Sequence, residues 1–138
     1  MTGPGRSFDE VSVGEELPAF TVVLTLQRLV MEAGANRDFS PWHFDPEISR
    51  ASGADHAFAN TTLVETLLEA CIRSWAGLAP RIRVLEFAMR KPSCAGEQLS
   101  AAGVVTATRG GNNPTVEIEV WIESATGRTV QGTAVLAF

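Results

Sequence analysis

The feature that most limits the fold of this chain is one helical pattern between Asn60 and Ala76 that is apolar on most sides. The positions that keep the helical period are Leu63, Leu67, Ala70, Cys71, Ser74 and Trp75, and the arc is widened by Val64, Leu68 and Ile72. Asn60 or either following threonine can cap its start, and Gly77 and Pro80 end it. Such a helix has to be buried, so we expect the rest of the chain to enclose it.

The rest of the chain predicts mainly strands. After the helix, strands are expected over 81–90, 98–108, 115–123 and 129–138, and the third alternates cleanly between apolar and polar residues. Before the helix we expect a strand over 20–24, a helix over 26–33 and a short helix over 46–51. One buried helix followed by an antiparallel meander favours an α+β fold with a sheet wrapped around that helix. The free edges of a single sheet favour pairing with a second chain.

Composition places the chain among globular proteins and excludes several functions. Its 138 residues are 45% hydrophobic, which predicts a single domain, over 8–138, and the polar run with glycine and proline over 1–7 predicts a loose leader. The net charge of −5 argues against electrostatic binding of nucleic acid. No apolar run reaches the roughly 20 residues of a membrane span. Two cysteines make neither a disulfide framework nor a metal knuckle, so we expect a cytoplasmic protein.

The segment between residues 34 and 46 carries the candidate chemistry. Asp38 and His43 lie five positions apart with Pro41 between them, so an extended or turning backbone can aim both side chains at one pocket. A carboxylate and an imidazole can act there as a general acid–base pair. The N-terminus of the long helix can stabilise an oxyanion. Asp45 can either orient His43 or cap the helix starting at Pro46, and on spacing alone an ordinary loop is favoured over a catalytic one.

The run from Arg37 to Asp45 resembles the signature of the MaoC-like (R)-specific enoyl-CoA hydratases and dehydratases, in which Asp, Asn-Pro, His and Asp recur at this spacing. Ser40 stands where that family usually has Asn. The stretch from Phe87 to Leu99 resembles the family's strand–Pro–Gly–acid–x–Leu segment. At the start of the long helix, Asn60 and Thr61 replace the family's His-Gly.

This Asn variant, with the Arg-Asp-Phe run and Ser74-Trp75-Ala76-Gly77, is most similar to the small subunits of actinobacterial steroid side-chain enoyl-CoA hydratases, which pair with a second hot-dog domain.

The resemblance implies a hot-dog fold and a hydro-lyase that adds water syn across a 2-enoyl thioester, or removes it from the (R)-3-hydroxy product. It implies that Asp38 and His43 are catalytic, that the Thr61 N–H with Asn60 alongside meets the oxyanion, and that Ser40 gives supporting hydrogen bonds. No metal or cofactor is implied beyond the coenzyme A or acyl-carrier thioester of the substrate. The acyl tunnel of this fold lies between protomers, so we expect a homodimer or a hetero-oligomer with a second hot-dog protein.

Four further residues are candidates for substrate binding. Trp42 and Phe58 are candidates for the acyl pocket, although an aromatic residue beside proline also serves as a packing plug. Arg90 and Lys91 are candidates for the phosphates of coenzyme A, although basic residues beside strands also form ordinary solvated edges.

Three other functions remain open at this point. Hot-dog thioesterases use an acidic residue on the central helix, and Glu65 or Glu69 could supply it. A non-catalytic subunit that completes a neighbour's tunnel is a second alternative. A dehydratase of polyketide or other secondary metabolism is the third.

Overall fold

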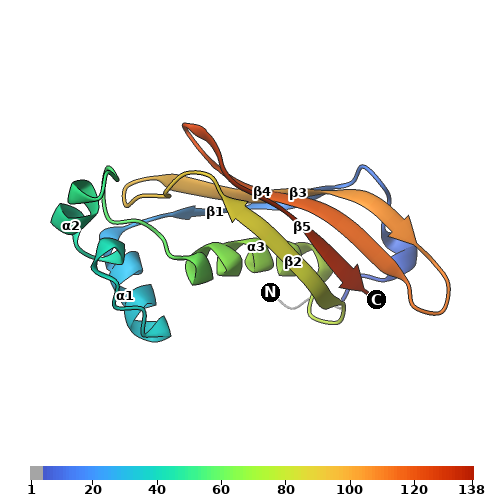
Figure 1. Cartoon of the computed structure of the whole chain (residues 1–138). Coiled ribbons are helices and arrows are strands. Elements are labelled where there is room, and N and C mark those ends of the chain that lie inside the picture. Colours follow the sequence, from blue (N-terminus) through green and yellow to red (C-terminus); the bar gives the residue numbers. More distant parts are fainter. Residues whose placement is uncertain (1–4) are drawn as a thin grey trace.

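A computed structural model describes residues 5–138 and shows one antiparallel sheet curved over one long helix (Figure 1). The helices are α1 (Leu26–Asn36), α2 (Pro46–Ala51) and α3 (Thr61–Ala76), with short 3₁₀ turns η1 (Phe8–Glu10) and η2 (Pro41–His43). The strands are β1 (Glu16–Val23), β2 (Arg81–Met89), β3 (Gln98–Arg109), β4 (Thr115–Ser124) and β5 (Gly127–Ala137). The expected α+β arrangement is therefore confirmed.

The long helix α3 is the core of the molecule, as its apolar pattern predicts. Asn60 caps it, because the Asn60 side-chain oxygen accepts the backbone N–H of Leu63 at 2.9 Å. Gly77 ends it with a φ of 78°, which glycine adopts without strain. The buried residues of α3 are Leu63, Val64, Leu67, Leu68, Cys71, Ile72, Trp75 and Ala76.

The sheet supplies the other half of the core. Its strand order is β1-β3-β4-β5-β2, with every pairing antiparallel. On β4 the alternation of the sequence becomes alternation of burial: Val116, Ile118, Val120 and Ile122 are all at most 1% exposed. These side chains belong to the same core as the buried face of α3, so helix and sheet exclude water together.

The two edge strands of the sheet, β1 and β2, both shift register, and β1 begins earlier than predicted. β1 begins at Glu16, before the expected start at Phe20, because Pro18 is tolerated in an edge strand whose register shifts between Leu17 and Phe20. Among residues 5–138, β2, the other edge, pairs with β5 alone and shifts register between Ile82 and Val84. β2 therefore keeps one edge available for another strand.

The segment between β1 and α3 folds as a group of short helices at the end of the molecule where α3 begins (Figure 1). α2 has its predicted bounds, whereas α1 continues three residues beyond the predicted end at Ala33, because Gly34 is tolerated inside a helix. Arg37 ends α1 in the left-handed conformation, with φ 55°, and the N–H of Asp38 bonds Ala33 O at 2.9 Å. This turn directs Asp38 out of the helix.

The opposite end of α3 is met by the N-terminal part of the chain. Of the predicted leader 1–7, residues 1–4 lie outside the described residues, and the N–H of Arg6 bonds Ala76 O at 3.1 Å. Before β1 the chain turns at Gly14, which has a φ of 86°. Within residues 5–138, the helices are all too short or too polar to cross a bilayer.

Candidate functional site

Asp38 and His43 come together at the site, as their spacing predicts. Asp38 Oδ2 lies 3.5 Å from His43 Nε2. Pro41 starts the η2 turn, in which the His43 N–H bonds Ser40 O at 3.1 Å, and this turn brings the imidazole back toward the end of α1. The two groups are close enough to hold one water molecule between them and a substrate.

The His43 ring is fixed by the residue before the long helix begins. His43 Nδ1 lies 2.9 Å from the Phe58 carbonyl oxygen, and the Phe58 ring packs edge-on against the imidazole at 5.3 Å. A carbonyl oxygen only accepts, so Nδ1 carries a proton. In the neutral ring Nε2 then bears the lone pair, and this is the nitrogen that faces Asp38. A neutral His43 is therefore oriented as a base.

The Asp38 carboxylate is held by donors from two directions. The Asn60 side-chain amide donates to Oδ2 at 2.9 Å, and the Ser40 backbone N–H donates to Oδ1 at 3.4 Å. These bonds, Asn60 first, together with His43, keep the pKa of Asp38 below its ordinary value against a smaller effect of burial. Asp38 is thus an ionised acceptor at neutral pH.

The start of α3 presents donors beside this pair. Asn60 caps the Leu63 N–H, and within the described part of the chain the backbone N–H groups of Thr61 and Thr62 have no acceptor. The positive end of the helix dipole lies at the same place. Because Asn60 also bonds Asp38, these free donors lie next to the Asp38–His43 pair. The arrangement can stabilise negative charge on a carbonyl oxygen.

Two residues have structural roles that spacing alone left open or missed. Asp45 caps α2 by accepting the N–H groups of Glu47 and Ile48 at 2.9 and 3.2 Å, so it does not orient His43. Ser49, fully buried, donates toward both Trp42 O and Asp45 O at 2.7 and 2.8 Å and ties α2 to η2. A serine inside a short helix gives no sequence signal for such a contact beyond its ability to bond the carbonyl four residues back.

The predicted substrate-binding residues lie around the pair and at the end of β2. Trp42 is 42% exposed and stands edge-on to His43, so it is not a buried plug. Arg90 and Lys91 are exposed and follow Met89, whose sulfur receives the Thr61 hydroxyl at 3.8 Å. The roles of Trp42, Arg90 and Lys91 in binding a substrate stay predictions.

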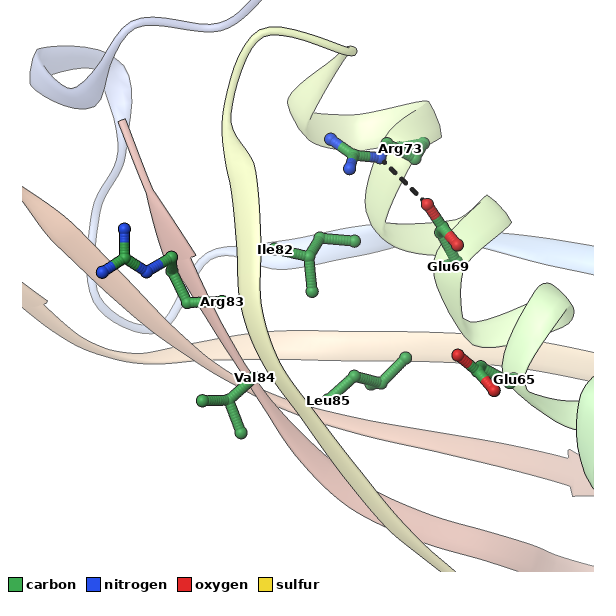
Figure 2. Close-up of a pocket in the computed structure, with 7 residues that line it drawn as sticks. All are labelled: Glu65, Glu69, Arg73, Ile82, Arg83, Val84 and Leu85. Carbon is green, nitrogen blue, oxygen red and sulfur yellow. Dashed lines mark hydrogen bonds and ion pairs between the residues drawn. The ribbon is translucent and has the colours of Figure 1, made fainter.

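Glu65 and Glu69 lie elsewhere, in a groove of about 350 Å³ between α3 and β2. Figure 2 shows Ile82 and Leu85 pointing from β2 toward the helix, while Arg83 and Val84 point away. Glu69 pairs with Arg73 at 3.4 Å on the helix surface. The two glutamates therefore form a surface separate from the Asp38–His43 pair.

A metal centre has no support in the described residues, because no three side chains of His, Cys, Asp or Glu come together there. The expectation that no metal or cofactor takes part stays a prediction.

Solved structures similar to this chain share its fold over nearly the whole length. A chain of the ChsH1–ChsH2 complex from Mycobacterium tuberculosis is 26% identical, with a TM-score of 0.85 over 92% of this chain and 98% of that one. The (R)-hydratase from A. caviae involved in PHA biosynthesis is 20% identical, with a TM-score of 0.84 over 92% and 96% of the two chains. A MaoC-like dehydratase, 24% identical, gives a TM-score of 0.89 over 97% of this chain and 42% of that one.

Neither the protein-family models nor the curated protein sequences give a match. The structural neighbours nevertheless confirm the hot-dog fold and the similarity to MaoC-like proteins and to the two-chain complex that the motif indicates.

Proposed function

We propose that this chain is a hydro-lyase of acyl thioesters, an (R)-specific enoyl-CoA hydratase that also runs as a 3-hydroxyacyl-thioester dehydratase. The observation that carries the proposal is the placement of Asp38 and His43, 3.5 Å apart, beside the free N–H groups that open α3. The hydratases and dehydratases among the structural neighbours support the reaction class.

In the hydration step, water lies against the Asp38 carboxylate and His43 Nε2. One of the two takes its proton while the water oxygen bonds to Cβ of the enoyl thioester. The electron pair of the Cα–Cβ double bond moves to the carbonyl oxygen as an enolate, which the Thr61 N–H stabilises. A donor of this kind contributes roughly 3–4 kcal/mol. The acquired proton then goes to Cα on the same face, which regenerates the carbonyl and the pair.

The remaining parts of the substrate have candidate partners on the same side. Trp42 and Phe58 flank the imidazole and would contact the acyl group, while exposed Arg90 and Lys91 would meet phosphates of coenzyme A or of a carrier protein's arm. The unpaired edge of β2 would seat a second hot-dog chain, identical or different. The two-chain neighbour from M. tuberculosis supports the heteromeric form. Both cysteines are free thiols, which fits the proposed cytoplasmic location.

The test is a panel of 2-enoyl-CoA substrates assayed with the purified chain, alone and with any hot-dog protein encoded beside it. Asp38→Asn and His43→Ala should each lower hydration by about 10²–10⁴-fold while leaving thermal unfolding close to that of the unaltered chain. Normal turnover in both variants contradicts the proposal. Activity that needs the second chain but not Asp38 would show a non-catalytic subunit instead.

Thioester hydrolysis is a second candidate because Glu65 faces the groove on α3. In that case release of free thiol from a saturated acyl-CoA would survive Asp38→Asn and be lost in Glu65→Gln or Glu69→Gln. Comparing a coenzyme A thioester with the matching carrier-protein thioester shows which of the two carriers the enzyme accepts.

A further inference from the structure

Asn60 uses both halves of its side-chain amide at the same time. Its oxygen accepts the N–H of Leu63 at 2.9 Å and caps α3, while its nitrogen donates to Asp38 Oδ2 at 2.9 Å. Asn60 is only 4% exposed, so water does not replace either bond readily. The residue thus links two segments that lie 22 positions apart in the chain.

We propose that Asn60 is a positioning residue that holds the Asp38 carboxylate toward His43 with its amide N–H₂ while its amide oxygen fixes the start of α3. The inference rests on the proposed function for its catalytic consequence and on the geometry for the contact itself. A rotation of Asp38 changes where the shared water lies, whereas the cap keeps the oxyanion donors of Thr61 and Thr62 in register with that water. One side chain therefore sets the distance between the two halves of the site.

The requirement is specific to a side chain with one donor and one acceptor. Aspartate at position 60 would still cap the helix but would place a second carboxylate against Asp38. Serine would also cap the helix, but its short hydroxyl would not reach Asp38 at the same time. A residue that acted only as a helix cap would tolerate both replacements, so these two variants separate capping from positioning.

The groups around Asp38 allow the effect of a new carboxylate on the pKa of Asp38 to be interpreted. Among residues 5–138, the titratable group facing Asp38 is His43 from η2, and the first turn of α3 carries no acidic residue. The other contacts are the Ser40 N–H and Asn60 itself. In Asn60→Asp, the pKa of Asp38 should therefore rise, because the amide donor is lost and a like charge is gained.

The experiment compares Asn60→Asp and Asn60→Ser with the unaltered chain in enoyl-CoA hydration over a range of pH. We expect kcat to fall about 10–100-fold in both, with a smaller change in KM, in proteins that still unfold in one cooperative transition, at a urea midpoint lowered by the lost buried hydrogen bond. In Asn60→Asp the acidic limb of the pH profile should move to higher pH. Unaltered kcat and an unaltered pH profile in both variants would overturn the inference.

A second measurement keeps this inference separate from the proposed function. The carboxyl carbon of Asp38 can be titrated by NMR in the same proteins, whether or not they turn over substrate. A higher pKa in Asn60→Asp supports the contact even if no hydratase activity is found, which would count against the proposed function alone. An unshifted Asp38 in an active enzyme overturns the inference. The matched control is Asp45→Asn, which alters the cap of α2 and should change neither kcat nor the Asp38 titration.

Discussion

The two ends of α3 are both polar, but they are completed in different ways. At the C-terminal end, the Trp75 indole N–H donates to Glu15 at 3.0 Å, and the Arg6 guanidinium pairs with the same carboxylate and lies 5.1 Å from the Trp75 ring. Arg73 donates to Pro80 O at 2.6 Å. At the N-terminal end, the N–H groups of Thr61 and Thr62 find no acceptor within residues 5–138, and His43 Nε2 lies 3.5 Å from Asp38 Oδ2.

The polar groups at the C-terminal end bond to one another and stabilise the fold, whereas the N–H groups at the N-terminal end remain available to a ligand. Burying polar groups is favourable only when they are paired, and the C-terminal end follows that rule almost throughout; Arg6 Nε is its exception among the described residues. The N-terminal end keeps the two threonine N–H groups without acceptors among the described residues, beside the partly exposed Asp38 carboxylate, so a ligand could bond to them in the proposed function. Substitutions at the two ends should therefore affect different measurements.

The largest effect should come from removing the pair at the N-terminal end. In the proposed mechanism Asp38 and His43 act on one water molecule, so the double variant Asp38→Asn/His43→Ala should lose no more than about tenfold beyond the worse single variant, after single losses of about 10²–10⁴-fold. Single-turnover hydration of an enoyl-CoA measures this. Losses that multiply would show that the two side chains act independently.

Trp75 should give the largest change in stability and little change in chemistry. Trp75→Ala removes a 7%-exposed indole from the core, so the free energy of unfolding should fall by roughly 3–5 kcal/mol. Urea unfolding followed by circular dichroism measures it. Trp75→Phe is the matched control, since it keeps an aromatic ring and loses the bond to Glu15. A lost turnover number in folded Trp75→Phe would break the separation between the two ends.

Glu15 should show how much the ion pair at the C-terminal end contributes. Glu15→Gln keeps an oxygen for the Trp75 N–H but removes the charge that faces Arg6. Both charged side chains are about a quarter exposed, at 28% and 23%, so solvent screening limits the expected loss to about 1 kcal/mol or less. The loss should shrink in high salt, as measured by urea midpoints at two ionic strengths. A loss that salt leaves unchanged would point to packing instead of charge.

The smallest effect should be a pH dependence shared by the two ends. The pKa of Glu10 is lowered chiefly by the Ser7 backbone N–H and then by its hydroxyl, and that of Asp38 chiefly by Asn60. Both carboxyls therefore stabilise the fold above their unfolded-state pKa values, and this stabilisation is lost as the pH falls through the lower folded-state values.

We expect the urea midpoint to decline below about pH 4, where ordinary carboxyls titrate. The decline should be less steep in Glu10→Gln. An equal decline in that variant would assign the whole effect to other carboxyls.

The sequence predicts the core better than it predicts the site. The period of α3 and the alternation of β4 arise from burial on one face, so both elements appear close to their expected bounds. The end of α1 was missed because Gly34 looks like a stop, although the left-handed residue is Arg37. Similarly, the first residues of β1 were not predicted because Pro18 argues against a strand. Proline is acceptable there because β1 lies at the edge of the sheet.

At the site, the spacing predicts that Asp38 and His43 meet, and the family resemblance adds Asn60, Thr61 and Phe58 as candidates but not the bonds that they make. Asp38 and His43 are related by one turn, which the proline signals. The bond from Asn60 to Asp38 and the bond from Phe58 O to His43 depend on how α3 docks against η2, and no local pattern encodes that docking. The strand order, which places β2 at an edge, is likewise a property of the packed core.

The left-handed conformation of Arg37 limits which residues can replace it during evolution. An ordinary side chain in that conformation costs about 1–2 kcal/mol, a cost that is incurred one residue before the carboxylate. Glycine or asparagine would relieve it, whereas valine, isoleucine or threonine would aggravate it through their branched Cβ atoms. Among homologues aligned on Asp38, this position should therefore hold charged, small or amide residues and lack β-branched ones. Backbone conformation, and not contact with substrate, would explain that restriction.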